Sequence, residues 1–114
     1  MTTTDKNRII AEFMGLKKDS PNIIWFYSSN KGKYYRENEL IYHSDWNWLM
    51  ELVDKIESLG FDTSLDRHEF GKKTTFFIRY GGSNTQSGIS KDNKIKAVYN
   101  ACFEFIQWYN QNKN

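Results

Sequence analysis

The chain has little cysteine, little proline and no long hydrophobic run. One cysteine among 114 residues excludes an internal disulfide and a cysteine-based metal cluster. One proline and seven glycines are too few for a low-complexity chain. No apolar run approaches the roughly 20 residues of a membrane helix, so we expect no membrane partner. The polar start of the sequence lacks the apolar core of a signal peptide, which predicts a cytoplasmic location.

The formal net charge of +2 is also small, and it does not by itself indicate a nucleic-acid partner. Aromatic residues, in contrast, are abundant: four Trp, seven Tyr and eight Phe make up 17% of the chain. These rings must form much of the core, and some of them are expected at the surface. The length suits a single domain over residues 1–114, with frayed tails at 1–4 and 111–114.

The clearest element is a helix in the middle of the chain. Ser44 is the expected N-cap, and Gly60 suits the position just after the last turn. The helical spacing of apolar residues predicts one buried stripe, formed by Trp46, Leu49, Met50, Val53 and Ile56. Trp48 lies beside this stripe, where an aromatic side chain is more often part of the core than a contact for a ligand or partner.

The other elements are read from alternation and turn residues. We expect helices near residues 5–14 and 90–110, and strands near 22–27, 33–36, 61–69 and 73–80. Residues 81–89 are rich in glycine and small polar side chains, which predicts a mobile loop. The order helix–hairpin–helix–hairpin–helix predicts an α+β fold. Its simplest form is an antiparallel four-stranded sheet layered with helices, as in an α/β/α sandwich.

The sequence contains no motif for catalysis or for metal binding. His43 and His68 lack the spacing of zinc ligands, and no Ser/His/Asp set or paired-carboxylate signature is present. Cys102 lies on the apolar stripe of the last helix, where it is expected to act as a small hydrophobic residue and not as a nucleophile. We therefore expect a protein that is not an enzyme and has no cofactor and no metal.

Two candidate binding surfaces follow. An exposed aromatic cluster would mark an interface with a host protein, a ligand or a second copy in a homodimer; its candidate residues are Tyr34, Tyr35, Tyr42 and Trp48. The alternative is a basic hairpin edge that binds nucleic acid or a nucleotide; its residues are Lys31, Lys33, Arg67, Lys72, Lys73 and Arg79. Lysines that only keep edge strands soluble would give the same pattern, and this simpler explanation is favoured over the basic edge.

Three segments together resemble a known family. They are residues 8–15 followed by an aromatic hairpin, residues 42–46 leading into the helix that ends at Gly60 and Phe61, and residues 97–101. This pattern resembles small phage and prophage proteins with a phage ABA sandwich domain, and it covers nearly the whole chain. The resemblance implies a layered helix–sheet–helix domain, a phage or prophage origin and thus a host bacterial cytoplasm. It implies no catalytic residues, and a loop at 81–88 is not part of the family pattern.

Overall fold

The computed structural model describes residues 1–18, 25–28, 31–68, 73–80, 84–90 and 93–112. The chain divides into two compact units, a first unit over Met1–Tyr42 and a second unit over His43–Asn114. Each unit contains helix and antiparallel sheet, so the expected α+β class is confirmed. The expectation of a single domain over 1–114 stays a prediction.

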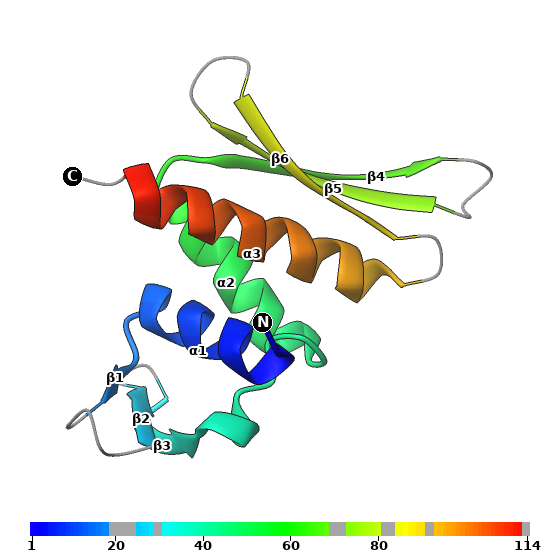
Figure 1. The fold of residues 1–114 in the computed structure, drawn as a ribbon. Helices are drawn as coiled ribbons and strands as arrows, with labels where there is room; N and C mark the ends of the chain where they lie inside the picture. The colour runs from blue at the N-terminus through cyan, green and yellow to red at the C-terminus, as the bar shows by residue number, and fades with distance from the viewer. Residues whose placement is uncertain (19–24, 29–30, 69–72, 81–83, 91–92, 113–114) are drawn as a thin grey trace. The chain divides into compact units, whose positions relative to one another are not determined.

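The first unit contains one α-helix and a small sheet (Figure 1). Helix α1 spans Thr3–Phe13, and the strands are β1 (Lys17–Lys18), β2 (Trp25–Ser28) and β3 (Lys33–Arg36). The strands are antiparallel in the order β1-β2-β3, and a 3-10 helix, η1, follows over Glu37–Glu39. Helix α1 starts at Thr3 through a capping box between Thr2 and Asp5, so the tail expected at residues 1–4 is partly helical.

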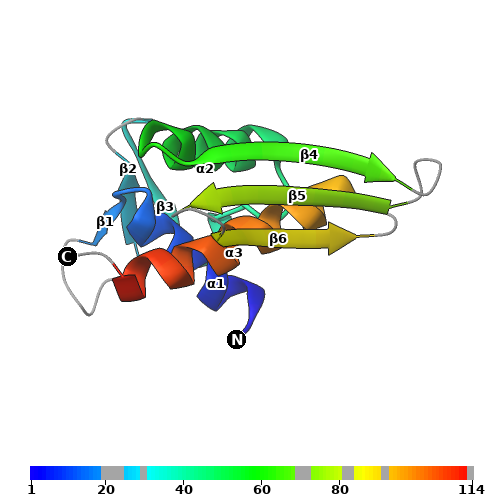
Figure 2. The same cartoon turned by 90° about the horizontal axis from the view of Figure 1, so that it is seen from above.

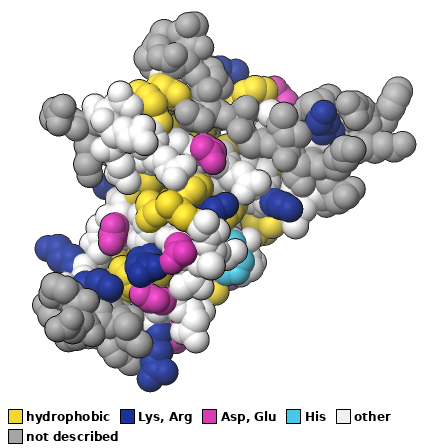
Figure 3. All heavy atoms as spheres, in the orientation of Figure 1, with side chains coloured by type: hydrophobic (Ala, Val, Ile, Leu, Met, Phe, Trp, Pro, Cys, Tyr) yellow, Lys and Arg dark blue, Asp and Glu magenta, His cyan; other side chains and the backbone are white. Residues whose placement is uncertain are grey.

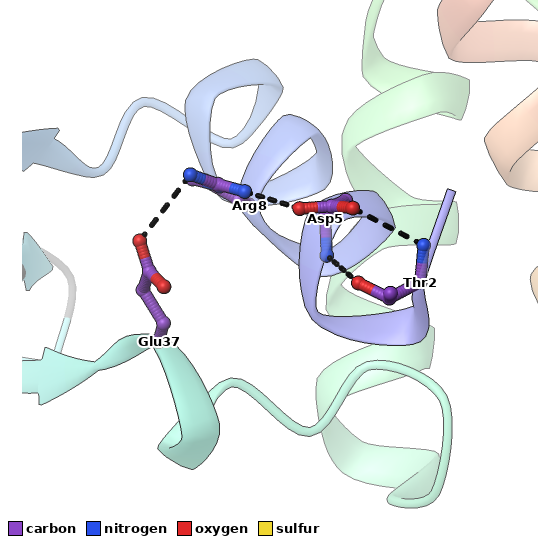
Figure 4. A network of polar contacts seen from close by, with 4 residues as sticks. All are labelled: Thr2, Asp5, Arg8 and Glu37. Carbon is purple, nitrogen blue, oxygen red and sulfur yellow. Dashed lines mark hydrogen bonds and ion pairs between the residues drawn. The ribbon is translucent and has the colours of Figure 1, made fainter.

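Polar side chains fasten the end of the first unit to α1. The buried Asn7 side chain donates from Nδ2 to the carbonyl oxygen of Leu40, at 2.8 Å. One turn along, Arg8 contacts Asp5 within α1 and reaches Glu37 Oε1 of η1 at 3.4 Å (Figure 4). The Asn7 bond is the stronger restraint, because it is buried whereas the ion pairs of Arg8 are partly in water.

The second unit has the element order α-β-β-β-α. Helix α2 spans Trp46–Ser58 and α3 spans Lys94–Asn112, on either side of three strands in sequence. These strands are β4 (Asp62–His68), β5 (Lys73–Tyr80) and β6 (Asn84–Ser90), antiparallel in the order β4-β5-β6. Helix α3 packs on β5 and β6, whereas α2 packs on β4 and α3. Figures 1 and 2 show both helices on the same face of this sheet.

The core of the second unit lies between its sheet and its helices. Phe76, Ile78 and Tyr80 alternate along the central strand β5 and are buried, as their period of two predicts. Helix α3 covers them with a buried face that includes Ala97, Val98, Ala101, Cys102 and Phe105. Helix α2 closes the layer with Leu49, Leu52, Val53 and Ile56. The unit is therefore two-layered, with one face of the sheet buried against helices.

The expected four-stranded sheet is wrong. The described strands form two separate three-stranded sheets, and the order helix–hairpin–helix–hairpin–helix does not hold. A further difference is β6, which adds a third strand to the second sheet and occupies most of the stretch expected as a mobile loop over 81–89; residues 81–83 lie outside the described residues. An edge strand is held by backbone hydrogen bonds to its neighbour, and its polar sequence does not show this. The expected α/β/α layering is also wrong for the second unit, whose two helices share one face of the sheet.

The helix boundaries differ from expectation by a few residues. The N-cap of α2 is Asp45 and not Ser44, because the Asp45 carboxylate accepts from the N–H groups of Asn47 and Trp48. Helix α3 begins at Lys94, since Ser90 ends β6 and cannot cap a helix. At the C-terminal end, α3 extends through Asn112, so residues 111 and 112 are helical and not a frayed tail.

Candidate binding surface

The structure does not assemble the four aromatic residues expected at an interface. Tyr42 and Trp48 are only 2% and 9% exposed, so neither offers a contact surface. Trp48 is buried because α2 turns the face with Leu49, Leu52 and Val53 to the core, which leaves Trp46 42% exposed instead. Tyr35 is half-buried, and Tyr34 is 53% exposed. Of the four, Tyr34 alone is largely accessible, and the expected cluster is corrected accordingly.

Tyr34 belongs to a second arrangement, on the small sheet of the first unit. Its Cα partner on β2 is Tyr27, and the partner of Tyr27 on β1 is Lys17. Paired residues of antiparallel strands project from the same face. The two tyrosine rings are therefore neighbours, with centroids 4.8 Å apart and planes inclined by 54°. We call the face with Lys17, Tyr27, Tyr34 and Arg36 the outer face.

The opposite face of the small sheet is its inner face. Phe26 lies there and is fully buried, and its partner Tyr35, on the same face, is half-buried. The Lys18 ammonium lies 5.3 Å from the centroid of the Phe26 ring, a cation–π geometry that covers the ring. Because strand side chains alternate between faces, burial of Phe26 fixes Tyr27 and Tyr34 on the side toward solvent. The outer face is thus determined by the packing of the inner one.

The outer face is basic. Residues 17–36 contain five Lys or Arg and a single acidic residue, Asp19, which lies outside the described residues. Lys17 and Arg36 of the outer face are exposed, and so is Lys33, which alternates with Tyr34 and therefore belongs to the inner face. The nearest acidic residues along the chain are in η1, where Glu37 pairs with Arg8 and Glu39 accepts from the Arg36 backbone N–H at 2.9 Å. Figure 3 shows charges of both signs interspersed around α1 and η1. The excess of positive charge is therefore on the strands.

The described residues of the expected basic edge are divided between the two units. Lys31 and Lys33 belong to the first unit, whereas Arg67, Lys73 and Arg79 belong to the second, and Lys72 lies outside the described residues. The prediction required the two hairpins to share a sheet, and they do not. Within β5, Lys73 and Arg79 are six residues and therefore about 20 Å apart. The Cα partner of Arg79 is Asp62, so that end of the sheet also carries a negative charge.

Tyr99 and Cys102 are ionisable residues in the core of the second unit. Burial raises the pKa of the Tyr99 hydroxyl to about 12 and raises the pKa of the Cys102 thiol. Both groups are therefore neutral near pH 7, and a buried thiol is unsuited to nucleophilic attack. The exposed His43 ring packs edge-on against Tyr99, with centroids 6.3 Å apart. Among the described residues, no three His, Cys, Asp or Glu side chains gather as a metal ion would require.

In the part of the chain that the structure describes, no helix is both long enough and apolar enough to cross a membrane.

Comparison with known proteins gives no relative: no family model matches the chain, and neither curated proteins nor solved structures give a match. The resemblance to phage ABA sandwich proteins stays a prediction.

Proposed function

We propose that this protein is a small non-enzymatic binding protein, of phage or prophage origin, that holds single-stranded nucleic acid on the outer face of its small sheet. The observation that supports this is the Tyr27–Tyr34 ring pair, in which Tyr34 is exposed and Tyr27 half-buried, set in a row with Lys17 and next to Arg36. Aromatic rings among basic side chains are the usual means of binding single strands, because bases stack on the rings while phosphates meet the cations.

The same surface is less suited to self-association, although a second copy is one of the partners expected from the sequence, beside a host protein or a ligand. A two-fold dimer places the same patch of both copies together. Two outer faces in contact would bring Lys17 and Arg36 of one copy against the same residues of the other. Like charges at an interface cost free energy, whereas a polyanion neutralises both. The charge of the outer face thus favours nucleic acid over a second copy.

A stacking contact predicts a clear response to truncation of Tyr34. Loss of one base–aromatic stack costs about 1–3 kcal/mol, so Tyr34→Ala is expected to weaken binding roughly 5- to 150-fold. Tyr34→Phe keeps the ring and should bind nearly as the wild type does. The measurement is fluorescence anisotropy of a labelled single-stranded oligonucleotide of mixed sequence, titrated at fixed salt.

The matched control is Trp46→Ala, because Trp46 is an exposed aromatic residue in the second unit, 42% exposed against 53% for Tyr34. Its loss should leave the affinity unchanged. The proposal is wrong if the two alanine variants behave alike, or if the wild type shows no affinity for the oligonucleotide. Size-exclusion chromatography with light scattering on the same samples tests the alternative, a homodimer that Tyr34→Ala dissociates.

A further inference from the structure

Strand β4 is an edge of the sheet in the second unit. The strand order is β4-β5-β6, so one side of β4 pairs with β5 and no described strand pairs with its other side (Figure 2). Such an edge presents a row of backbone N–H and C=O groups to a further strand. In the middle of β4, Leu65 is 45% exposed, although it shares the helix side of the sheet with its partner Phe76, which is 5% exposed. The edge thus combines backbone groups with an accessible apolar side chain.

A second copy of the chain could extend this sheet by placing its own β4 antiparallel to the first, about a two-fold axis. Opposite residues of an antiparallel pair either both direct their backbone groups toward each other or both direct them away. The axis must therefore pass beside a residue and not between two residues. An axis beside Leu65 pairs the whole of β4, Asp62–His68, whereas axes beside Thr63 or Arg67 pair only residues 62–64 or 66–68 of the strand.

The charges of β4 favour the same axis. An axis beside Ser64 would place Asp62 opposite Asp66 of the second copy, and an axis beside Asp66 would place Asp66 opposite itself. Like charges directly opposite one another are destabilising. With the axis beside Leu65, the two Asp66 side chains are only diagonal neighbours, about 7–8 Å apart. Asp66 is then opposite Ser64, whose hydroxyl oxygen is buried and has no hydrogen-bond partner among the described residues. This register offers that hydroxyl a carboxylate acceptor.

The same register brings opposite charges together on the helix side of the sheet. Glu57 of α2 lies over β4 there, because its Oε2 accepts a hydrogen bond from Thr63 Oγ1 at 2.6 Å. Arg67 of the second copy would be opposite Thr63 and on the same face. Arg67 is exposed, and both ion pairs found among the described residues belong to Arg8 and not to it. The Arg67 side chain would therefore lie beside the Glu57 carboxylate of the other copy.

We infer that the protein forms a two-fold dimer through β4, with Leu65 against Leu65 at the axis and Arg67 beside Glu57 of the other copy. Two three-stranded sheets then become one continuous sheet, and the two Leu65 side chains are buried between the Phe76 side chains of the two copies. The paired charges favour a second copy over an unrelated strand, because they are complementary only in this register. Pairing of β4 with β6 would instead leave free edges and form a filament.

The first test is the mass of the full chain by sedimentation velocity over a concentration series. The mass should rise from the 13.6 kDa of one chain toward twice this value and no further. Leu65→Lys places two ammonium groups at the axis and should keep the mass of one chain throughout. The matched control is Leu59→Lys, at a leucine that is 39% exposed and lies outside β4, and it should keep the dimer. Circular dichroism verifies that both variants are folded.

Three outcomes of this experiment would overturn the inference. They are a wild type with the mass of one chain at every concentration, a dimer that Leu65→Lys leaves intact, and masses that continue to grow beyond the dimer.

Disulfide cross-linking under mild oxidation tests the register. Leu65→Cys should link two chains, because directly opposite Cα atoms are about 4.5–5.5 Å apart, within the range of a disulfide. Arg67→Cys, at another exposed position of β4, should not link, since its two copies are about 13 Å apart along the strands. The wild type is the control for Cys102, which is fully buried. Any result other than selective linking at position 65 would overturn the inference.

Charge reversal tests the contact between Arg67 and Glu57. Arg67→Glu should weaken the dimer, and the double variant Arg67→Glu with Glu57→Arg should restore it, because the pair is again of opposite sign. A double variant as weak as Arg67→Glu alone would overturn the inference. The dimer does not depend on the outer face, so Tyr34→Ala should keep the wild-type mass even where it loses the oligonucleotide. Dissociation by Tyr34→Ala would move the interface to the outer face and overturn the inference.

Discussion

At the scale of single residues, the first unit depends on one buried amide. Asn7 is 1% exposed and lies on a helix, where a buried polar side chain is unfavourable unless it is satisfied. Its Nδ2 group donates to the Leu40 carbonyl, 33 residues further along the chain. This bond fixes the segment after η1 against α1, and it does so next to the small sheet whose outer face we assign to binding.

Asn7→Ala should therefore destabilise the protein. The substitution leaves the Leu40 carbonyl without its donor in a buried place, which costs about 1–3 kcal/mol of unfolding free energy. Glu12→Ala, at an exposed position of the same helix, is the control and should change stability by less than about 0.5 kcal/mol. Urea unfolding followed by circular dichroism measures both. An Asn7→Ala variant as stable as the control would show that the bond contributes nothing.

The candidate site was only partly predictable at this scale. Tyr34 is identifiable because it lies in a short strand between lysine and arginine. Tyr27 is missed, since its place beside Tyr34 depends on the register of β2 and β3, which the turn sets. Tyr42 and Trp48 are buried whereas Tyr34 is exposed. All three are aromatic residues near an expected strand or helix, so the residue type does not show which ring is exposed.

At the scale of elements, the ends of helices are set by local chemistry. Gly60 follows the C-cap of α2 with φ of 96°, a left-handed conformation that side chains with a Cβ adopt at a cost. A Cβ added there would meet nothing within 4 Å. The requirement for glycine is thus conformational and not steric, which is why the sequence alone locates this helix end.

Gly60→Ala should accordingly cost about 1–2 kcal/mol of unfolding free energy, because the left-handed region is unfavourable for a residue with a Cβ. Gly60→Asn should cost less, since asparagine tolerates this conformation better. Urea unfolding of the two variants side by side makes the comparison. A loss for Gly60→Asn as large as that for Gly60→Ala would indicate a clash, contrary to the open space around this residue.

Elements with a regular spacing of apolar residues were predicted better than elements without one. Strand β5 has the expected bounds, Lys73–Tyr80, because large apolar residues alternate along it. The buried face of α2 was only partly predicted. The expected stripe and the observed buried face share Leu49, Val53 and Ile56. The structure buries Trp48 and Leu52 on one side of these residues, and not Trp46 and Met50 on the other. Only the neighbouring elements decide which side is buried. Strand β6 is polar and has no stripe at all, so its pairing with β5 was missed.

At the scale of the whole molecule, the two units differ in how much core each has. The second unit brings together two helices and three strands, including the cluster in which Phe105 meets Phe61, Trp108 and Tyr109. Their centroids lie 4.8 to 5.9 Å from that of Phe105, distances typical of favourable aromatic pairs. Among its described residues, the first unit has a single α-helix, ten residues in strands and three in η1.

A fragment of residues 43–114 is therefore expected to fold alone, with a cooperative thermal transition and a near-ultraviolet signal from its packed aromatic rings. A fragment of residues 1–42 is near the size below which a chain rarely folds without a disulfide or metal, and it should show neither property. Circular dichroism of both fragments tests this. A non-cooperative melt of the larger fragment would show that its core requires the rest of the chain.

The burial of Cys102 has a practical consequence for such measurements. This thiol is fully buried in α3, and it is the one cysteine of the protein. A thiol reagent can reach it only when the second unit opens, so the rate of labelling in native buffer depends on how readily this unit opens. With fast reclosing, that rate reports the free energy of opening without any denaturant. The protein thus contains its own single-site probe for the opening of the second unit, and this probe needs no engineered label.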